Sequence, residues 1–506
     1  MVQALNRSVK VIARVGDENR LVKRYTAASS WPAKAKNSPP RSGGNPLKWP
    51  PSLPGVRSAM VPQAYLERLK SLSTQLVALQ KPIRILDAIK WPASVEAQFR
   101  AARGRELPAL EADFYQGYTL SFDPPQLKQR LRELRQDVRR QLGRSDALGR
   151  ILQATIDQYL LVIELLIHRG TAEFGRFSRE LYGSASDNLR GDRKTLRQLG
   201  ERLCHIFSLP AVENLNRPYP NHIPADSAVQ ILHQRMQDYF GAGEVRVQIS
   251  DDIVSDASAG GDCIKINRRA HFSELDLQVL EVHEGWVHIG TTLNGRAQPW
   301  ATWLSVGSPR ITAIQEGMAV LMETLTFSSF PQRARRISDR VVAVDLAERG
   351  ADFCEVYRYF LERGVSEHDS YRVTQRVFRG GTLTGGSVFT KDISYVKGFV
   401  ENVNFLRAAI HTGVPEIIPM LFVGKVTLDD VPLLYERYLD GVIAPPKYLP
   451  PMFKNLNGLY VWFGFSSSMS LMDLARVQQH FSKRFCKLPQ TQVQPILKDT
   501  TDTELD

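Results

Sequence analysis

The sequence predicts a mostly helical α+β fold, and three observations support this class. Apolar residues recur at three- and four-residue spacing over much of 61–207 and 310–440, which is typical of amphipathic helices. Two short segments, EVRVQIS and CIKIN, alternate apolar and polar residues as strands do. No internal repeat of the length that solenoid proteins use is present.

The composition is that of a globular protein with a basic N-terminal segment. The 506 residues are 43% hydrophobic and 23% charged, enough for two or three packed domains. Residues 1–60 hold eleven Lys or Arg and two acidic residues, a net of +9, which leaves +3 of the total of +12 for the rest. Because this segment is also rich in Pro, Gly and Ser, we expect 1–56 to be a disordered tail. The alternative for this segment is an arm that docks on an acidic partner. At the other end of the chain, 488–506 is expected to be a second flexible tail.

Cysteine usage and hydropathy indicate the compartment. The four cysteines form no CxxC pair, which is typical of reduced thiols, so a metal site would have to use His and carboxylate ligands. The chain has no run of eighteen apolar residues and no signal-peptide core. We therefore expect a soluble, cytoplasmic protein with no membrane partner. Since most of the excess charge lies in the tail, we expect no nucleic-acid partner, and the oligomeric state is left open.

Two domains are expected between the tails. The first, 57–215, is helical, because YLERLKSLSTQLVALQ, LKQRLRELRQDVRRQLG and ALGRILQATIDQYLLVIELLIHRG each have helical periodicity. A Pro-rich stretch, NRPYPNHIPADSA, leads into the second, 216–487. This domain is expected to begin with the helix SAVQILHQRMQDYFG, the strand EVRVQIS, a loop containing SDASAGGD and the strand CIKIN. A long helical part follows this small sheet.

The stretch LEVHEGWVHIG places two histidines five residues apart. Ser273 and the aspartate three residues later fit a capping box, so a helix should begin there and run through His283 and His288. In a regular helix, positions five apart differ by about 140° in direction. A π-bulge, for which Gly285 leaves room, would let the histidines converge with Glu284 beside them. The alternative is two histidines on different faces of a buried helix, and the motif alone leaves both open.

A carboxylate in a later helix offers a third metal ligand. Ser308 and Pro309 are expected to begin a helix that is apolar on nearly every side, and Glu316 interrupts it. A buried carboxylate is costly unless it is paired or bound to metal, so Glu316 is a candidate ligand of a zinc ion with an open fourth position. An ion pair with a later arginine is the alternative. Glu323, on roughly the same face, is the fallback ligand or a partner that orients one.

Five separated motifs carry a family resemblance. HEGWVH, QEGMA, RVVAVDLAERGADF, RVFRGG and FTKDISYVKG, in this order, resemble the bacterial proteins named for flavohaemoglobin expression modulation and a QEGLA motif. Those proteins are similar in turn to the microtubule-associated tyrosine carboxypeptidases of animals. The resemblance covers roughly residues 60–455, with Met318 in place of the leucine of the motif's name. It implies that 216–487 is a zinc metallopeptidase-like domain. It also implies that one zinc is held by His283, His288 and Glu316, with Glu284 as the catalytic glutamate.

The expected reaction is removal of a C-terminal residue, tyrosine-like or other, from a protein or peptide. Zinc would polarise the carbonyl and activate a water whose proton Glu284 transfers. Tyr395 and His271 are candidates for stabilising the oxyanion. The strand at 263–267 is expected to offer an edge on which a peptide can pair.

Basic residues around two glycine pairs are the candidates for binding the substrate's free carboxylate. In YRVTQRVFRGGTLTGGSVFTKDISY these are Arg376 or Arg379, with Lys391, and a guanidinium can form two charge-assisted hydrogen bonds with a carboxylate. Structural ion pairs are the alternative for each. Two other functions stay open. One is a regulatory protein with a structural zinc that modulates flavohaemoglobin expression, and the other is a zinc endopeptidase or aminopeptidase.

Overall fold

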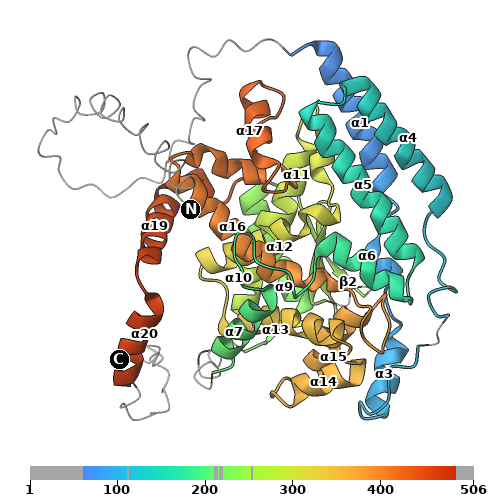
Figure 1. Ribbon diagram of the computed structural model, residues 1–506, viewed down its shortest axis with the longest axis vertical. Helices are drawn as coiled ribbons and strands as arrows, with labels where there is room; N and C mark the ends of the chain where they lie inside the picture. Colours follow the sequence, from blue (N-terminus) through green and yellow to red (C-terminus); the bar gives the residue numbers. More distant parts are fainter. Residues whose placement is uncertain are drawn as a thin grey trace, which may run out of the picture. The chain divides into compact units, whose positions relative to one another are not determined.

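The computed structural model describes residues 61–485 apart from 111–112, 210–214, 216–219, 252 and 254. These residues are mostly helical (Figure 1) and include two small sheets, which confirms the predicted α+β class. The two expected tails, 1–56 and 488–506, lie outside the described residues, so they stay predictions.

The N-terminal part is helical, as its periodicity predicts. Its helices are α1 (Gln63–Gln80), α2 (Ile85–Ala88), α3 (Ala93–Ala101), α4 (Pro124–Leu142), α5 (Ala147–Ile167), α6 (Ala172–Tyr182) and α7 (Leu196–Phe207). In α4, Asp123 caps the first turn by accepting a hydrogen bond from the amide of Gln126 at 2.7 Å. One stripe of α4 is buried, from Leu127 to Val138, and most of its arginines face solvent. The helix is therefore amphipathic in the sense that its sequence predicts.

Two small sheets precede the histidine motif. β1 (Ile223–Pro224) pairs antiparallel with β5 (His271–Phe272) on either side of α9 (Ala225–Phe240) in the chain. The second sheet has the order β2-β4-β3, with β2 (Arg246–Ser250) parallel and β3 (Ala257–Gly260) antiparallel to β4.

The order of this sheet corrects one expectation. β4 (Cys263–Asn267) is the central strand, so its backbone groups already pair on both sides and it offers no edge to a peptide. The segment SDASAGGD, expected to be a loop, contains β3, which is an edge strand. The edge that faces the histidine motif is therefore formed by β3.

The rest of the described chain is again helical. Its α-helices, with one π-helical segment, are α10 (Glu274–Leu280), the π-helical segment (Glu281–Ile289), α11 (Gly290–Arg296), α12 (Thr312–Leu325), α13 (Pro331–Glu348), α14 (Phe353–Leu361), α15 (Glu367–Phe378), α16 (Ser394–His411), α17 (Val431–Leu439), α18 (Pro451–Lys454), α19 (Asn457–Ser468) and α20 (Leu474–Phe485). No helix in the described part of the chain is both long and apolar enough to cross a membrane.

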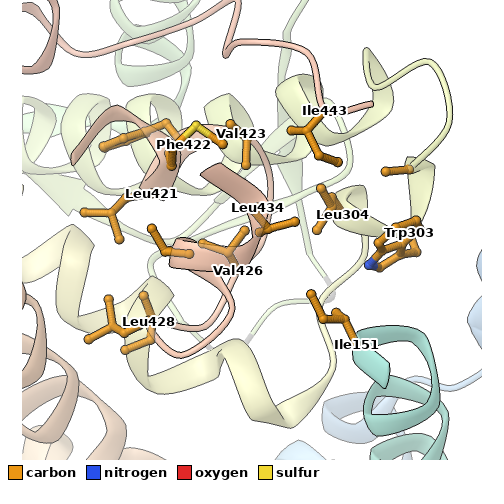
Figure 2. Close-up of a cluster of buried hydrophobic side chains, with 14 of the residues drawn as sticks. Ile151, Trp303, Leu304, Leu421, Phe422, Val423, Val426, Leu428, Leu434 and Ile443 are labelled. Atoms are coloured by element: carbon orange, nitrogen blue, oxygen red, sulfur yellow. The ribbon is translucent and has the colours of Figure 1, made fainter. Parts of the chain in front are cut away.

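Three hydrophobic cores hold these elements together. The largest joins α1, α4 and α5 to α12, α16 and the segment 415–463. Figure 2 shows the part of it where Ile151 of α5 lies near Trp303, Leu304 and side chains from 421–443. A second core joins α3 and α6 to α13, α14 and α15, and a third lies between α9 and the sheets. The two larger cores contain residues from both sides of position 215, where the sequence predicts a domain boundary.

Candidate functional site

The helix of the histidine motif begins as predicted and then widens. At its start, Ser273 Oγ accepts a hydrogen bond from the amide of Asp276, and Asp276 Oδ2 accepts one from the amide of Ser273. After α10 the chain continues as a π-helix over Glu281–Ile289. The imidazole rings of His283 and His288 lie on the same side, with centroids 5.0 Å apart. The predicted π geometry is confirmed, and it brings the two histidines together.

Gly285, between the histidines, lies against α9. A Cβ on this glycine would come within 2.7 Å of Met236 Sδ, so the end of the Met236 side chain would have to shift to make room for it. The next residue, Trp286, stacks on Tyr239 of α9 with ring centroids 5.3 Å apart. The π-helical segment therefore packs against α9 at Gly285 and Trp286.

Glu316 reaches the two histidines from α12. Its Oε2 lies 3.6 Å from Nε2 of His283 and 3.6 Å from Nε2 of His288. The ligand atoms of these three side chains all lie within 4.8 Å of one another, so the cluster could hold a metal ion. The start of the helix differs from the prediction: α12 begins at Thr312 after a 3-10 turn, and the buried hydroxyl of Ser308 makes no capping bond.

The glycine after Glu316 fixes where α12 crosses α16. A Cβ on Gly317 would lie 1.9 Å from the carbonyl carbon of Gly398, so only a residue without a side chain fits. This contact between the helices places Glu316 close to the residues just before α16. One of them, Lys391, donates a hydrogen bond to Glu316 Oε1 at 2.8 Å.

Lys391 also settles the charge of Glu316. Burial alone would raise the pKa of Glu316, but the Lys391 ammonium and the two imidazoles lower this pKa well below its usual range. Glu316 is thus a carboxylate, with one oxygen bound to Lys391 and the other directed at the histidines. The alternative role expected for Glu316 was an ion pair with a later arginine; in the structure its ion-pair partner is Lys391.

Glu323 lies on the opposite side of the His283 ring. Its Oε1 is 2.6 Å from Nδ1 of His283, whereas Glu316 faces Nε2. Arg333 binds both oxygens of Glu323 at 2.7 Å. Burial would raise the pKa of Glu323, but Arg333 and His283 lower it to about 2. A charged carboxylate on Nδ1 leaves Nε2 of His283 as the nitrogen that can act as a ligand, as expected of a partner that orients the ring.

Glu284 projects toward the edge strand. Its Oε2 accepts a hydrogen bond from the amide of Ala259 in β3 at 2.9 Å. Glu284 lines the same cavity as His283, His288 and Glu316. A carboxylate next to, but separate from, the possible ligands can act as a proton acceptor in this cavity.

A cavity of about 360 Å³ opens beside the cluster. Three arginines of α13, namely Arg333, Arg336 and Arg340, line it at a spacing that puts them on one helix face. Arg372, Arg376 and Arg379, on and just after α15, line it as well. The lining of the cavity is therefore rich in guanidinium groups. Sequence reasoning missed the α13 arginines, although their spacing in RARRISDR was a usable signal.

The predicted substrate-binding cations differ in how far they are paired. Arg376 forms a two-point ion pair with the buried carboxylate of Asp392, with Nη2 at 2.8 Å from Oδ1. Lys391 is paired with Glu316. Arg379 is buried, and no described carboxylate lies within ion-pair distance of it; burial and the charge of Arg376 lower its pKa to about 10. Of these cations, Arg379 has the greatest electrostatic need for an added anion.

The two candidates for stabilising an oxyanion lie at different depths. Tyr395 is buried, its ring centroid is 6.5 Å from that of His283, and the Arg340 guanidinium lies 4.3 Å from the ring centroid. His271 lines the cavity but is exposed, in β5. Tyr395, which stacks beside His283, is therefore the more buried of the two candidates.

Comparisons with known proteins give one family match. The sequence model of a family described as microtubule-associated tyrosine carboxypeptidase matches residues 97–471. No curated protein matches the sequence. Among solved structures, the crystal structure of M32 carboxypeptidase from Deinococcus radiodurans R1 is similar at 16% sequence identity, with a TM-score of 0.35. That similarity covers 79% of this chain and 98% of the other.

Proposed function

The chain belongs to the family of microtubule-associated tyrosine carboxypeptidases, and on this premise we propose that it is a zinc-dependent carboxypeptidase that removes C-terminal residues from peptides or proteins. The observation that carries the proposal is the convergence of His283, His288 and Glu316 in a cavity that Glu284 also lines. The two histidines, five residues apart, converge because the helix has a π turn.

The donor set fits zinc. Two imidazole nitrogens and one carboxylate oxygen are the ligands of many hydrolytic zinc sites, which keep a fourth position open. The carboxylate of Glu316 is already ionised, and Glu323 occupies the other nitrogen of His283. These three protein ligands would hold one ion. The cavity beside them supports a catalytic site, because structural zinc sites are closed by four protein ligands.

The proposed chemistry divides between the ion and the chain. A bound zinc ion would supply a Lewis acid that polarises the scissile carbonyl and lowers the pKa of a water in the site. Glu284 accepts the proton of the attacking water and delivers it to the leaving amine. The Tyr395 hydroxyl and the cations around it stabilise negative charge on the carbonyl oxygen.

The substrate's backbone is proposed to lie along β3. The amide of Ala259 points out of the sheet toward Glu284, and because strand groups alternate, the amide of Ala257 points the same way. An extended peptide adding to this edge passes directly beside Glu284. The terminal carboxylate is received by Arg379, with Arg376 and Lys391 adding positive charge, because Arg379 has no carboxylate of its own among the described residues.

A peptide library tests the proposal. After incubation with the zinc-loaded protein, mass spectrometry should find peptides shortened by single residues from the C-terminus. Amidating that terminus should slow cleavage about a hundredfold, because a buried cation then loses its partner. Internal cuts or loss of N-terminal residues would assign the protein to the endopeptidases or aminopeptidases. Bound zinc without any cleavage would favour a structural, regulatory role.

A further inference from the structure

The C-terminal helix has an apolar face that nothing in the described chain covers. In α20 (Leu474–Phe485) the apolar residues Leu474, Val477, Phe481 and Phe485 recur at spacings of three, four and four, which places them along one side. Every residue from Leu471 to Phe485 is exposed. Burial of this face therefore requires something other than the cores of the described chain.

The apolar surface continues onto the preceding helix. In α19 the side chains of Leu459 and Phe463 are buried in the largest core, while Trp462 is 62% and Phe465 73% exposed. Leu471, in the turn that leads to α20, is 90% exposed. The segment from Trp462 to Phe485 thus presents large apolar side chains on two consecutive helices, far more than the scattered single residues of ordinary surfaces.

The polar side of α20 carries only positive charge. Arg476, Lys483 and Arg484 are its charged residues, and no acidic residue lies within Leu474–Phe485. A second copy of α20, packed apolar face to apolar face, would cover that face but would bring no anionic group to these cations. An anionic surface with an apolar layer beneath it matches both sides of the helix at once.

This segment also lies at the end of the family match, which stops at residue 471. The elements that build the histidine cluster and its cavity all precede it. Neither the cluster nor the cavity includes a residue of α20. The helix is thus an addition to the part of the chain that matches the family.

We propose that α20, with the exposed aromatic residues of α19, lies on the surface of an anionic lipid bilayer. Phe481 and Phe485 enter the boundary between headgroups and acyl chains, and Lys483 and Arg484 extend to the lipid phosphates. The helix binds the surface without crossing the bilayer, in keeping with the lack of a spanning helix among the described residues. This proposal departs from the expectation of no membrane partner, which rested on the lack of a spanning segment and of a signal-peptide core.

Vesicle co-sedimentation of the full chain tests this proposal. The probes are phosphatidylcholine vesicles with and without one-third phosphatidylserine. Binding is expected only to the anionic vesicles and should weaken as salt is added. Phe481→Ser/Phe485→Ser and Lys483→Gln/Arg484→Gln should each weaken it about tenfold or more. The matched control, Ala475→Ser/Gln479→Ser, changes no charge and lies off the apolar face, so it should bind like the unaltered chain.

Three results would overturn the proposal. Equal binding to neutral vesicles would remove the role of the cations, and a lack of binding to either kind would remove the bilayer. In the second case, self-association lost in Phe481→Ser/Phe485→Ser would assign the face to a second copy. Because residues 1–60 are also basic, binding that survives both double variants would assign vesicle attachment to another part of the chain. Thermal melting of each variant checks that the body of the protein is folded.

Discussion

Gly317 of α12 and Gly398 of α16 meet backbone to backbone. A Cβ on Gly398 would lie 1.6 Å from the carbonyl oxygen of Ala313, one turn before Gly317. Glu316 immediately precedes one member of this pair, and Lys391 lies seven residues before the other. The glycine contact therefore sets the distance at which the carboxylate meets its lysine.

Substituting Gly317 should damage both stability and the metal site. Gly317→Ala must push α12 and α16 apart, which should cost about 3 kcal/mol and shift Glu316 away from the histidines. The control, Gly464→Ala in α19, has open space around it and should be neutral or stabilising by up to about 1 kcal/mol. Thermal melting and metal titration measure the two effects. A Gly317→Ala protein that melts like Gly464→Ala would show that the helices can separate without cost.

Metal content should depend on each of three side chains. We expect about one zinc per chain, with occupancy falling sharply in His283→Ala, His288→Ala and Glu316→Ala, since each loses one of three ligands. His233→Ala is the matched control, because His233 pairs with Gln237 on α9, outside the cluster. Elemental analysis of the purified, folded variants provides the measurement. Full zinc retention in Glu316→Ala would remove this residue from the ligand set.

Glu284→Gln should separate metal binding from turnover. The amide keeps the shape of the side chain but cannot accept the proton, so peptide cleavage should fall at least about a hundredfold while zinc is retained. Glu281→Gln, in the same π-helical segment, alters a carboxylate that pairs with Arg235 and should leave cleavage nearly unchanged. Rates of release of a C-terminal residue compare the two. Unchanged turnover in Glu284→Gln would refute Glu284 as the proton acceptor.

Glu323 should tune zinc affinity without binding the ion. Glu323→Gln weakens the contact that orients His283 and leaves Arg333 without its carboxylate, so zinc affinity should drop about 10- to 100-fold. Competition with a chelator measures this affinity. Asp345→Asn, which changes a buried carboxylate elsewhere on α13, is the control and should not alter it. Equal affinity in both variants would make Glu323 a structural residue alone.

Arg379 should report on the substrate's end group. Arg379→Gln is expected to slow cleavage of free-acid peptides toward the rate for amidated ones, which removes most of the roughly hundredfold preference. Arg372→Gln changes a cavity arginine already paired with Asp256 and should keep most of that preference. The ratio of the two kcat/KM values is the readout. A preserved ratio in Arg379→Gln would return Arg379 to a structural role.

The sequence predicted what depends on local spacing. Apolar periodicity marked α4 and α5. The five-residue interval from His283 to His288, together with the capping box, raised the π turn as one of two alternatives, and the structure shows the π turn. The place of Glu316 in an apolar helix indicated that it needs a cationic partner, and left open whether this partner is a metal ion or an arginine. Each of these inferences needs only helix geometry and the cost of burying charge.

Features that depend on distant partners were not predicted. SDASAGGD consists of small residues with weak strand propensity, and it becomes β3 because β4 is beside it. The pairing of Arg376 with Asp392 and of Lys391 with Glu316 is decided by how the helices pack, which no single segment encodes. The same holds for the α13 arginines, whose shared cavity forms only in the folded chain.

The π turn also sets the direction in which the side chains of the following helix, α11, point. One residue more or less in a helix turns the later residues by about 100° around its axis. Asn294 of α11 depends on this phase: its amide nitrogen donates to the carbonyls of Phe422 and Tyr448 at 2.7 and 2.8 Å. Deleting one residue between the histidines would restore the four-residue interval of ordinary zinc proteases, yet it would swing Asn294 out of these bonds. Two separate features thus depend on the π turn: the convergence of the two histidines, and the hydrogen bonds of Asn294 to the C-terminal part of the described chain.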